Sequence, residues 1–414
     1  MPPSLLNPAV RAEARALRTS ELPCYVYDLT ALDLHAAAVR AFLPRTVELY
    51  YAAKANPEPE VLATLAPWTD GFEVSSGGEL AHVRSAVPGQ PLAFSGPGKT
   101  PDELAAALAA GVERVHAESL HEVRMLRALA ARSSVPGRPP TRVLLRVNPA
   151  VPDGTLTGSA LTMGGRPTPF GMGTEEASEA LRLLTGGDCP GLEAAGVHAH
   201  LASGLPAEAL LRVAEAIVDA AAGLARHHRT ALPEVVVGGG MAVDYIRPAD
   251  RFDWATYGAG LDALARRHPG VRLRVEPGRA LTAYCGWYVT DVLDVKRSHG
   301  EDVAVVRGGT HHLRTPAAKG HDQPAEVVPV EPWPHPWPRP AAVGGRVTVA
   351  GQLCTPKDVL ARGLEAAGLR AGDRVVFALA GAYAWNISHR DFLMHPAPGF
   401  RFLGGSGTRS PGEC

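Results

Sequence analysis

One lysine stands at the end of an apolar run near the start of the chain. Val47 to Ala53 has the β-branched and aromatic residues of a buried strand, and Asn56-Pro57 ends the run. Lys54 is therefore predicted at the mouth of a sheet. Burial disfavours an ammonium ion and therefore lowers the pKa of such a lysine. A larger fraction of the side chain is then the neutral, nucleophilic amine. The alternative is an amine that reaches solvent from the strand end.

Glycines and polar residues follow other apolar runs. Three of these glycines are consecutive, and Gly278 with Arg279 follows the next run. Glycines let backbone N–H groups approach an anion, although a lone triplet is more often a tight turn. A phosphate site beside a lysine amine favours pyridoxal phosphate bound as a Schiff base. The residues at or just after the ends of the apolar runs are Glu73 with Ser75 and Ser76, Arg146, His198 with His200 and Ser203, the triplet Gly238, Gly239 and Gly240, and Glu276.

Eight short apolar runs, each followed by a segment with helical spacing, organise the first part of the chain. In Thr100–Ala110, for example, Pro101 suits a first helical turn and Gly111 ends the segment. Eight β-then-α units over roughly 240 residues predict a (β/α)8 TIM barrel, which usually needs about 250 residues. The competitor is an open doubly wound sheet, but no Gly-x-Gly-x-x-Gly follows the first strand. The runs are Val47–Lys54, Gly71–Ser76, Leu92–Gly96, Arg114–Ser119, Arg142–Pro149, Gly196–Ala202, Glu234–Gly240 and Val271–Gly278.

The pattern changes after about residue 283. Apolar runs of strand length separated by turns predict a mostly antiparallel β-domain, with one helix near Pro356–Ala367 and a stiff proline-rich loop at Glu331–Pro340. We expect a barrel domain over residues 29–282, a β-domain over 1–28 and 283–403, and a flexible tail over 404–414. The predicted β-domain strands lie in Cys285–Lys296, Asp302–Val306, Arg346–Leu353 and Arg374–Leu379.

Composition excludes several classes of protein. The chain has 414 residues, 46% of them hydrophobic, and a net charge of -1, which argues against a nucleic-acid partner. Its apolar runs are too short to span a membrane. Met1 to Pro23 lacks the apolar centre of a signal peptide, so a cytoplasmic protein is expected. The five cysteines are scattered without a Cys-x-x-Cys pair, and no metal site is predicted.

From about Tyr25 to Phe392 the chain resembles the fold-type III pyridoxal-phosphate decarboxylases of ornithine, lysine, arginine and diaminopimelate. Each matching piece is short, but all of them occur in the order that the family has. The pieces are Tyr51-Ala-Ala-Lys54-Ala-Asn, Val74-Ser-Ser-Gly-Gly-Glu79-Leu, Ser95-Gly-Pro-Gly-Lys99-Thr, Arg146-Val-Asn-Pro, His200-Leu-Ala-Ser203-Gly, Gly238–Gly240, Glu276-Pro-Gly-Arg279, Leu353-Cys354-Thr-Pro-Lys-Asp358 and Gly381-Ala-Tyr383.

The resemblance implies a role for each matching residue. Lys54 would form the Schiff base, and His200 would stack on the pyridine ring, with His198 as the alternative. Glu276 would keep the ring nitrogen protonated, so that the ring can take up electrons as CO₂ leaves. Cys354 would return a proton to the substrate carbon, reaching the cofactor from the partner subunit of a homodimer. The implied cofactor-binding residues also include Arg146, Ser203, Gly238, Gly239, Gly240, Gly278, Arg279 and Tyr383.

Cys354 and Tyr383 each have a purely structural alternative, because a lone cysteine is often buried in a core and a tyrosine can simply pack within a β-domain.

The departures from the family pattern concern the substrate. Thr355 stands where family members that act on diamino acids usually have an acidic residue. The short segment Gly308–His321 contains five basic residues, His311, His312, Arg314, Lys319 and His321. It predicts either a solvated basic turn or a site for a carboxylate-rich amino acid.

The family's aromatic-Asn-Gly ending after Gly381-Ala-Tyr383 is also absent, and Trp385 to His395 stands in its place. Thr355 and this missing ending are similar to the siderophore-pathway branch of the family, which decarboxylates citryl-2,3-diaminopropionate. Diaminopimelate is the alternative substrate, since it too has a distal carboxylate. Two other classes remain open. An amino-acid racemase would share the barrel, lysine and cofactor, but it would place an arginine, not Glu276, at the ring nitrogen. A regulatory relative would lack Lys54 or Cys354, and both are present.

Overall fold

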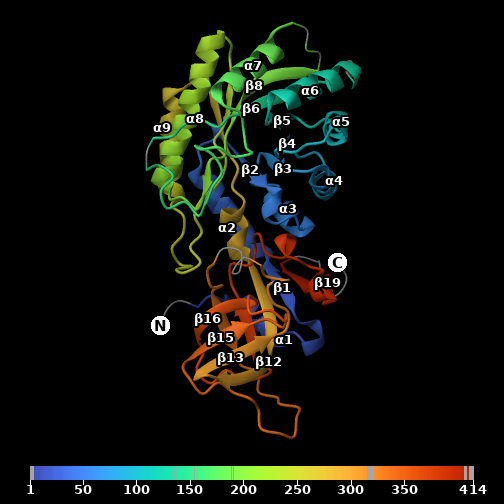
Figure 1. Cartoon of the computed structure of the whole chain (residues 1–414), viewed down its shortest axis with the longest axis vertical. Coiled ribbons are helices and arrows are strands. Elements are labelled where there is room, and N and C mark those ends of the chain that lie inside the picture. Colours follow the sequence, from blue (N-terminus) through green and yellow to red (C-terminus); the bar gives the residue numbers. More distant parts are fainter. Residues whose placement is uncertain are drawn as a thin grey trace. The chain divides into compact units, whose positions relative to one another are not determined.

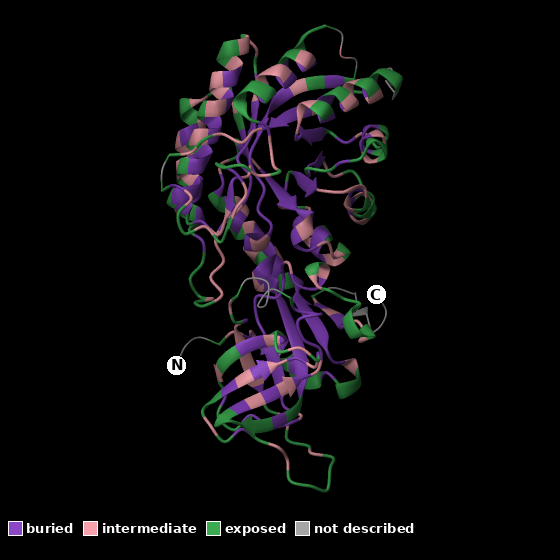
Figure 2. Ribbon diagram, viewed as in Figure 1, coloured by how far each residue is buried: buried purple, intermediate pink, exposed green. Residues whose placement is uncertain are grey.

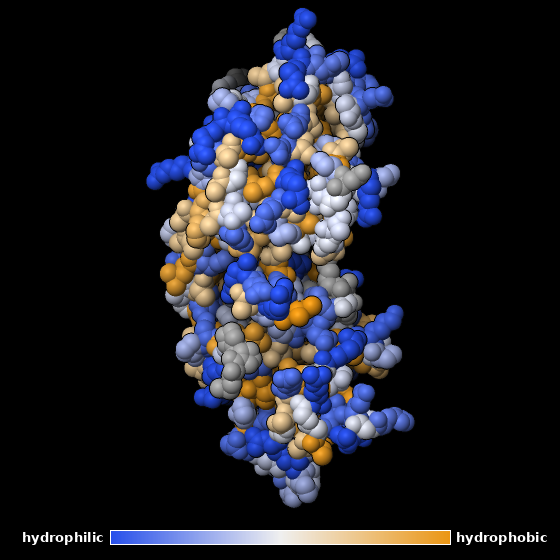
Figure 3. All heavy atoms as spheres, turned by 90° about the vertical axis from the view of Figure 1, so that its left-hand side faces the viewer, coloured by the Kyte–Doolittle hydropathy of each residue, from blue (hydrophilic) through white to orange (hydrophobic). Residues whose placement is uncertain are grey.

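The computed structural model describes residues 4–133, 137–152, 154–187, 189, 191–314, 320–404 and 408–409. The chain divides into two compact units (Figure 1). The barrel unit comprises His35–Ala242 and Phe252–Ala280, and the β-unit comprises Met1–Leu34, Val243–Arg251 and Leu281–Cys414. Of the described helices, none has both the length and the apolar composition needed to span a membrane. Hydrophilic residues cover much of the face drawn in Figure 3, with hydrophobic side chains between them.

Eight parallel strands close into a barrel, as the sequence predicts. Each strand pairs in parallel with the next, and β11 pairs with β2 to complete the ring. All eight predicted runs contribute one strand. The strands are β2 (Val47–Ala52), β3 (Gly71–Val74), β4 (Leu92–Phe94), β5 (Arg114–Ala117), β6 (Thr141–Arg146), β8 (Leu192–His198), β10 (Glu234–Val236) and β11 (Arg272–Val275).

Helices follow the barrel strands, and buried residues alternate with exposed ones along several of them (Figure 2). Local sequence sets their ends. In α5 (Pro101–Ala109), Thr100 and Glu103 form a reciprocal capping box, and Gly111 with a φ of 67° follows the last turn. The other helices of this part are α2 (Leu29–Phe42), α3 (Pro59–Leu65), α4 (Gly77–Ala86), α6 (Leu120–Ser133), α7 (Thr174–Thr185), α8 (Ala207–His228), α9 (Trp254–Arg267) and α10 (Arg279–Thr282).

The first residues of several barrel strands form a buried ionic network. Arg114 Nε donates to Glu234 Oε2 at 2.8 Å, and Arg274 Nη2 donates to Glu234 Oε2 at 3.2 Å and to Glu48 Oε2 at 2.5 Å. The Arg274 guanidinium also lies 4.2 Å from the centre of the Tyr50 ring. Arg274, Glu234 and Arg114 are almost fully buried. This end of the barrel is therefore filled by paired charges.

The β-unit has a nine-stranded, mostly antiparallel sheet. Strand β1 (Cys24–Asp28) lies between β12 (Gly286–Ser298), which is antiparallel to it, and β18 (Gly399–Leu403), which is parallel. Helix α1 (Pro8–Ala16) buries Val10 and Ala14 in the core beside this sheet. The other strands are β13 (Glu301–Val306), β14 (Ala325–Val328), β15 (Arg346–Ala350), β16 (Val359–Glu365), β17 (Arg374–Phe377) and β19 (Thr408–Arg409). Short 3₁₀ turns lie at Thr19–Glu21, Ala283–Cys285, Trp385–Ile387 and Phe392–Met394.

Two predictions for this unit need correction. The helix expected near Pro356–Ala367 is wrong, because Val359–Glu365 forms β16, antiparallel to β15. Gly363 has a φ of 64°, which a regular helix does not allow. The tail expected to be flexible from Gly404 contains β19, which pairs with β18. Within the described residues 331–340 there is neither helix nor strand, as the prolines predict.

Candidate active site

Lys54 follows the last residue of β2 and lies in a 3₁₀ turn, Ala53–Ala55. Its Nζ donates to both carboxylate oxygens of Glu73, at 2.8 and 2.6 Å, and lies 3.4 Å from Ser75 Oγ. Burial alone would raise the pKa of Glu73, but the Lys54 ammonium and hydrogen bonds from Lys54 and Ser95 hold it far below its usual range. Glu73 is therefore a carboxylate and Lys54 is its counter-ion, so this lysine is not a simple solvent-reaching side chain.

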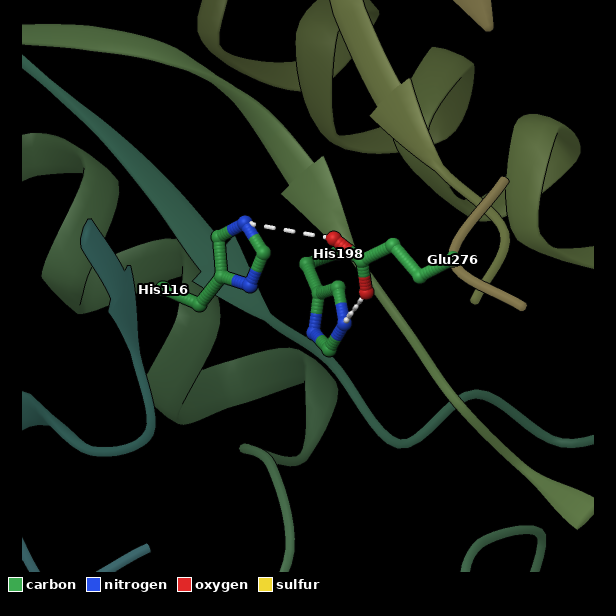
Figure 4. Close-up of side chains that lie close together, drawn as sticks. All are labelled: His116, His198 and Glu276. Carbon is green, nitrogen blue, oxygen red and sulfur yellow. Dashed lines mark hydrogen bonds and ion pairs between the residues drawn. The ribbon is translucent and has the colours of Figure 1, made fainter. Parts of the chain in front are cut away.

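Glu276 lies just after β11 between two buried histidines (Figure 4). Its Oε2 is 3.2 Å from His198 Nε2, and its Oε1 is 4.0 Å from His116 Nε2. The imidazole rings of His116 and His198 stack, with centroids 4.1 Å apart and planes 19° from parallel. Burial lowers the pKa of both histidines well below its ordinary value and raises the pKa of Glu276. Both imidazoles are therefore neutral.

His116, His198 and Glu276 are residue types that often bind metals, and one ligand atom from each lies within 4.8 Å of the others. An imidazole binds a metal through a lone pair in the plane of its ring. Since the two rings are stacked and almost parallel, their lone pairs lie in separate planes and do not converge on one point. This arrangement does not suit a shared metal ion.

The glycine triplet follows β10 and approaches the backbone of two neighbouring strand ends. A Cβ on Gly239 would lie 2.3 Å from the Glu276 carbonyl oxygen, and one on Gly240 would lie 2.2 Å from the Ala202 carbonyl oxygen. Gly238 and Gly240 also have φ values of 71° and 94°. Only glycine fits at these positions, so the backbone lies at the barrel mouth without side chains.

His200 and Ser203 lie beside this triplet. The N–H group of Gly239 donates to His200 Nδ1 at 3.2 Å, which fixes the imidazole ring. Burial, followed by the charges of Arg146 and Lys54, lowers the pKa of His200 to about 3, so the ring is neutral. Ser203 belongs to the short strand β9 (Ala202–Ser203), which pairs with β7 (Leu161–Thr162). The Gly204 N–H donates to the Gly240 carbonyl at 2.8 Å.

Arg146 ends β6 in a buried position. Its Nη1 pairs with Glu118 Oε1, and its guanidinium lies 4.7 Å from the centre of the Phe170 ring. Glu118 Oε2 also accepts the N–H of Gly171 at 3.0 Å. Arg146 is thus held by protein partners, and its charge helps to keep His198 and His200 neutral after the larger effect of burial.

The sequence interpretation missed His116 and Glu118, and it gave Ser95 no role. A signal was present, because Arg114, His116 and Glu118 alternate along one predicted strand. Alternate residues of a barrel strand point to the interior, where apolar side chains are usual. A run of polar residues at every second position therefore indicates a polar barrel interior.

Cys354, Thr355 and Tyr383 belong to the β-unit, whereas Lys54 belongs to the barrel unit. Cys354 is exposed in the turn between β15 and β16. The Thr355 N–H donates to the Leu353 carbonyl at 2.8 Å within this turn. Tyr383 is half-buried and has a φ of 50°. The exposed thiol does not fit the alternative of a core cysteine.

The prediction of a basic loop is wrong for two of its members. His311 and His312 are buried, and His312 lies 3.0 Å from both the Tyr288 hydroxyl and the Pro396 carbonyl oxygen. Burial, with neighbouring histidines, lowers the pKa of His311 to about 4 and that of His312 to about 3. Neither carries a positive charge at neutral pH. Arg314 is exposed, and Lys319 lies outside the described residues.

Known proteins resemble the chain over most of its length. The family model described as pyridoxal-dependent decarboxylase, pyridoxal binding domain, matches residues 30–283. A Staphylococcus aureus protein named 2-[(L-alanin-3-ylcarbamoyl)methyl]-2-hydroxybutanedioate decarboxylase is 36% identical over 382 residues, covering 92% of this chain and 93% of the relative. A diaminopimelate decarboxylase of Actinosynnema pretiosum is 32% identical over 372 residues, covering 87% of this chain and 79% of the relative.

A solved structure, the diaminopimelate decarboxylase from M. jannaschii, has a TM-score of 0.82 to this chain at 21% identity, covering 94% of this chain and 89% of that one. At that identity the likeness concerns the fold alone. Together with the closed barrel and the separate antiparallel sheet, it confirms the predicted fold class.

Proposed function

Because the chain belongs to the family of pyridoxal-dependent decarboxylases, we propose that its substrate is a carboxylate-rich amino acid of the citryl-2,3-diaminopropionate type, used in siderophore biosynthesis. The observation that carries the proposal is the 36% identity to the Staphylococcus aureus decarboxylase over 92% of the chain. The name of that relative describes an amino acid joined through an amide to a hydroxylated dicarboxylate. Thr355 supports the proposal, because an acidic side chain there would repel such a substrate.

The residues at the barrel mouth fit pyridoxal phosphate. Lys54 supplies an amine, and the glycine triplet brings backbone without side chains next to Ser203, where it can contribute to binding a phosphate group. Glu276 Oε1 and His116 Nε2 are buried polar atoms without a hydrogen-bond partner among the described residues, which suits a polar ring atom at Glu276. When bound, this cofactor supplies an electron sink for the pair of electrons left as CO₂ departs.

We assign the roles of the chain's own residues on this basis. Lys54 binds the cofactor covalently, Glu276 holds a proton at the ring nitrogen, and His200, fixed by Gly239, covers one face of the ring. Glu73 orients the Lys54 amine through two hydrogen bonds. The ion pair between Arg146 and Glu118 joins the ends of β6 and β5. The phosphate ligands are Ser203, the Gly238–Gly240 backbone, Gly278, Arg279 and Tyr383.

Diaminopimelate remains the second candidate substrate, since the diaminopimelate decarboxylase of Actinosynnema pretiosum is 32% identical over 87% of the chain. The deciding measurement is release of CO₂ from each compound, with the amine product identified by mass spectrometry. Preference for the citryl compound in kcat/KM supports the proposal. Preference for diaminopimelate, with no turnover of the citryl compound, would reject it.

Arg314→Ala is expected to raise KM for the citryl substrate by roughly tenfold to a hundredfold, because a charge-assisted hydrogen bond contributes about 1.5–3 kcal/mol. The side chain is exposed and donates to the Ile387 carbonyl at 3.3 Å, so its charge is available to a carboxylate. Steady-state kinetics of both substrates would measure the effect.

The control for this variant is Arg346→Ala, which removes another exposed guanidinium of the β-unit, one paired with Glu365 at 3.5 Å. It should leave KM unchanged. Equal KM values for wild type and Arg314→Ala would show that Arg314 is solvated surface, and diaminopimelate would then be favoured.

We further propose that the enzyme is a cytoplasmic homodimer in which Cys354 of one subunit serves the cofactor bound to Lys54 of the other. Inactive Lys54→Ala and Cys354→Ala proteins, mixed under conditions of subunit exchange, should then regain roughly a quarter of wild-type activity. A heterodimer has one site with both residues intact and one with neither, by the two-fold symmetry of the interface.

Subunit exchange itself can be followed with two affinity tags, and a mixture of Cys354→Ala with Cys354→Ser protein is the matched control that should stay inactive. If tagged subunits exchange and activity does not return, Cys354 does not act across subunits. Cell fractionation would test the cytoplasmic location.

A further inference from the structure

An unpaired pair of buried polar atoms involves Glu276. His116 Nε2 and Glu276 Oε1 face each other at 4.0 Å, and both are buried without a hydrogen-bond partner among the described residues. The other carboxyl oxygen, Oε2, lies 3.2 Å from His198 Nε2. A buried polar atom without a partner destabilises the folded protein. Two such atoms that face one another indicate that something polar belongs between them.

The hydrogen bonds behind His116 decide where its proton lies. Ser95 Oγ is 2.7 Å from Glu73 Oε1 and 3.1 Å from His116 Nδ1. Glu73 is ionised beside Lys54, so its oxygens only accept hydrogen bonds. The single hydroxyl proton of Ser95 must therefore point to Glu73. Towards His116 the serine oxygen can only accept, which places a proton on Nδ1.

A neutral imidazole has one N–H group and one lone pair. With its proton on Nδ1, His116 presents a lone pair at Nε2 to Glu276 Oε1. If Glu276 were a carboxylate, two sets of lone pairs would face each other in a buried place. One proton on Oε1 removes this conflict, and a shift of about 1 Å brings the two atoms to hydrogen-bond distance.

We propose that in the cofactor-free protein Glu276 is a neutral carboxylic acid whose Oε1–H donates to Nε2 of His116, so that His116 is a positioning residue for Glu276. The contacts then form one chain of hydrogen bonds. Lys54 and Ser95 donate to Glu73, His116 donates to Ser95, and Glu276 donates to His116. Burial raises the pKa of Glu276, in agreement with this assignment. The other charged or titratable groups that act on Glu276, His116 and His198 are Lys54, Glu73, Arg146, His200 and Arg274.

The consequence concerns loading of the cofactor. A neutral Glu276 avoids an unpaired negative charge in the barrel before the cofactor binds. A basic ring nitrogen that binds beside Glu276 meets a group that already carries a proton. This consequence rests on the proposed role of Glu276, but the protonation state itself can be measured without cofactor, so failure of one is distinguishable from failure of the other.

Infrared spectroscopy of the cofactor-free protein tests the proposal. The spectrum at neutral pH should contain the carbonyl band of a protonated carboxyl group, and the near-isosteric Glu276→Gln variant should lose it. In wild-type protein, ¹⁵N NMR should find His116 as the Nδ1–H tautomer, assigned by comparison with His116→Phe. Absence of the carboxyl band, or an Nε2–H tautomer of His116, would overturn the proposal.

Ser95 variants separate positioning from general structure. Ser95→Ala removes the acceptor at Nδ1, so the Nε2–H tautomer should appear and the carboxyl band should weaken in proportion. Ser95→Thr keeps the hydroxyl group and should keep the band. The control is Ser178→Ala, since Ser178 Oγ lies 2.6 Å from His228 Nε2 in a serine–histidine pair between α7 and α8. It should leave band and tautomer unchanged. A band that stays at full strength in Ser95→Ala would show that Ser95 and His116 do not hold the proton on Glu276.

Discussion

Replacing Lys54 with alanine is expected to abolish the visible absorption of the cofactor-supplemented protein and to lower kcat/KM by roughly 10³ to 10⁶, the range seen when a covalent catalyst is removed from other enzymes. The amine lies at the barrel mouth, held by both oxygens of Glu73 at 2.8 and 2.6 Å. No other amine has this position among the residues that line the described strand ends, because Lys99 is buried against Glu122.

Absorption spectra during cofactor titration, together with CO₂ release, would measure the effect. Lys54→Arg is the matched variant, since it keeps a positive charge beside Glu73 but cannot form a Schiff base. It should retain wild-type stability while losing the absorption band. A wild-type protein that stays colourless after cofactor supplementation, or a Lys54→Arg protein that turns over normally, would contradict the assignment.

Replacing Glu234 with glutamine is expected to lower the free energy of unfolding by about 3–5 kcal/mol, the usual cost of removing one partner from a buried ion network. Glu234 is 2% exposed and pairs with three arginines near the start of the barrel strands. Its carboxylate accepts from Arg114 at 2.8 Å and Arg274 at 3.2 Å, and it lies 2.5 Å from Arg142. Without this charge, the buried guanidinium groups repel one another.

Denaturant unfolding followed by circular dichroism would measure the loss. Glu193→Gln is the control at the same end of the barrel, because Glu193 is 47% exposed in its side chain and lies 3.7 Å from Arg142. Its loss should cost no more than about 1 kcal/mol. Equal unfolding free energies for the two variants would mean that the network at Glu234 is solvated and contributes little.

Local sequence was sufficient for the barrel strands and for part of the site. The β-branched runs and the turn residues between them predicted all eight barrel strands, because a strand buried on both faces needs an apolar run of that length. Lys54 and the Gly238–Gly240 triplet were predicted at strand ends for the same reason. Parallel strands of a barrel bring such ends to one face, so a shared site followed from the fold class.

Short apolar runs were ambiguous where their partner was distant in sequence. Val359–Glu365 has residues that suit either a helix or a strand, and pairing with β15 made it a strand. Burial likewise decided the charge of His311 and His312. Their sequence indicated a basic loop, but packing around Tyr288 and Pro396 removed the water that would stabilise an imidazolium ion.

The residues around Glu276 depended on tertiary structure most of all. His116, His198 and Glu73 lie in β5, β8 and β3. Glu276 and Ser95 directly follow β11 and β4. The sequence alone determined that a lysine, a carboxylate and glycines lie at strand ends of one barrel. Only closure of the barrel decided which donor faces which acceptor, because hydrogen bonds and stacking require contact within a few ångströms, and here such contacts join residues that are distant in sequence, such as His198 and Glu276.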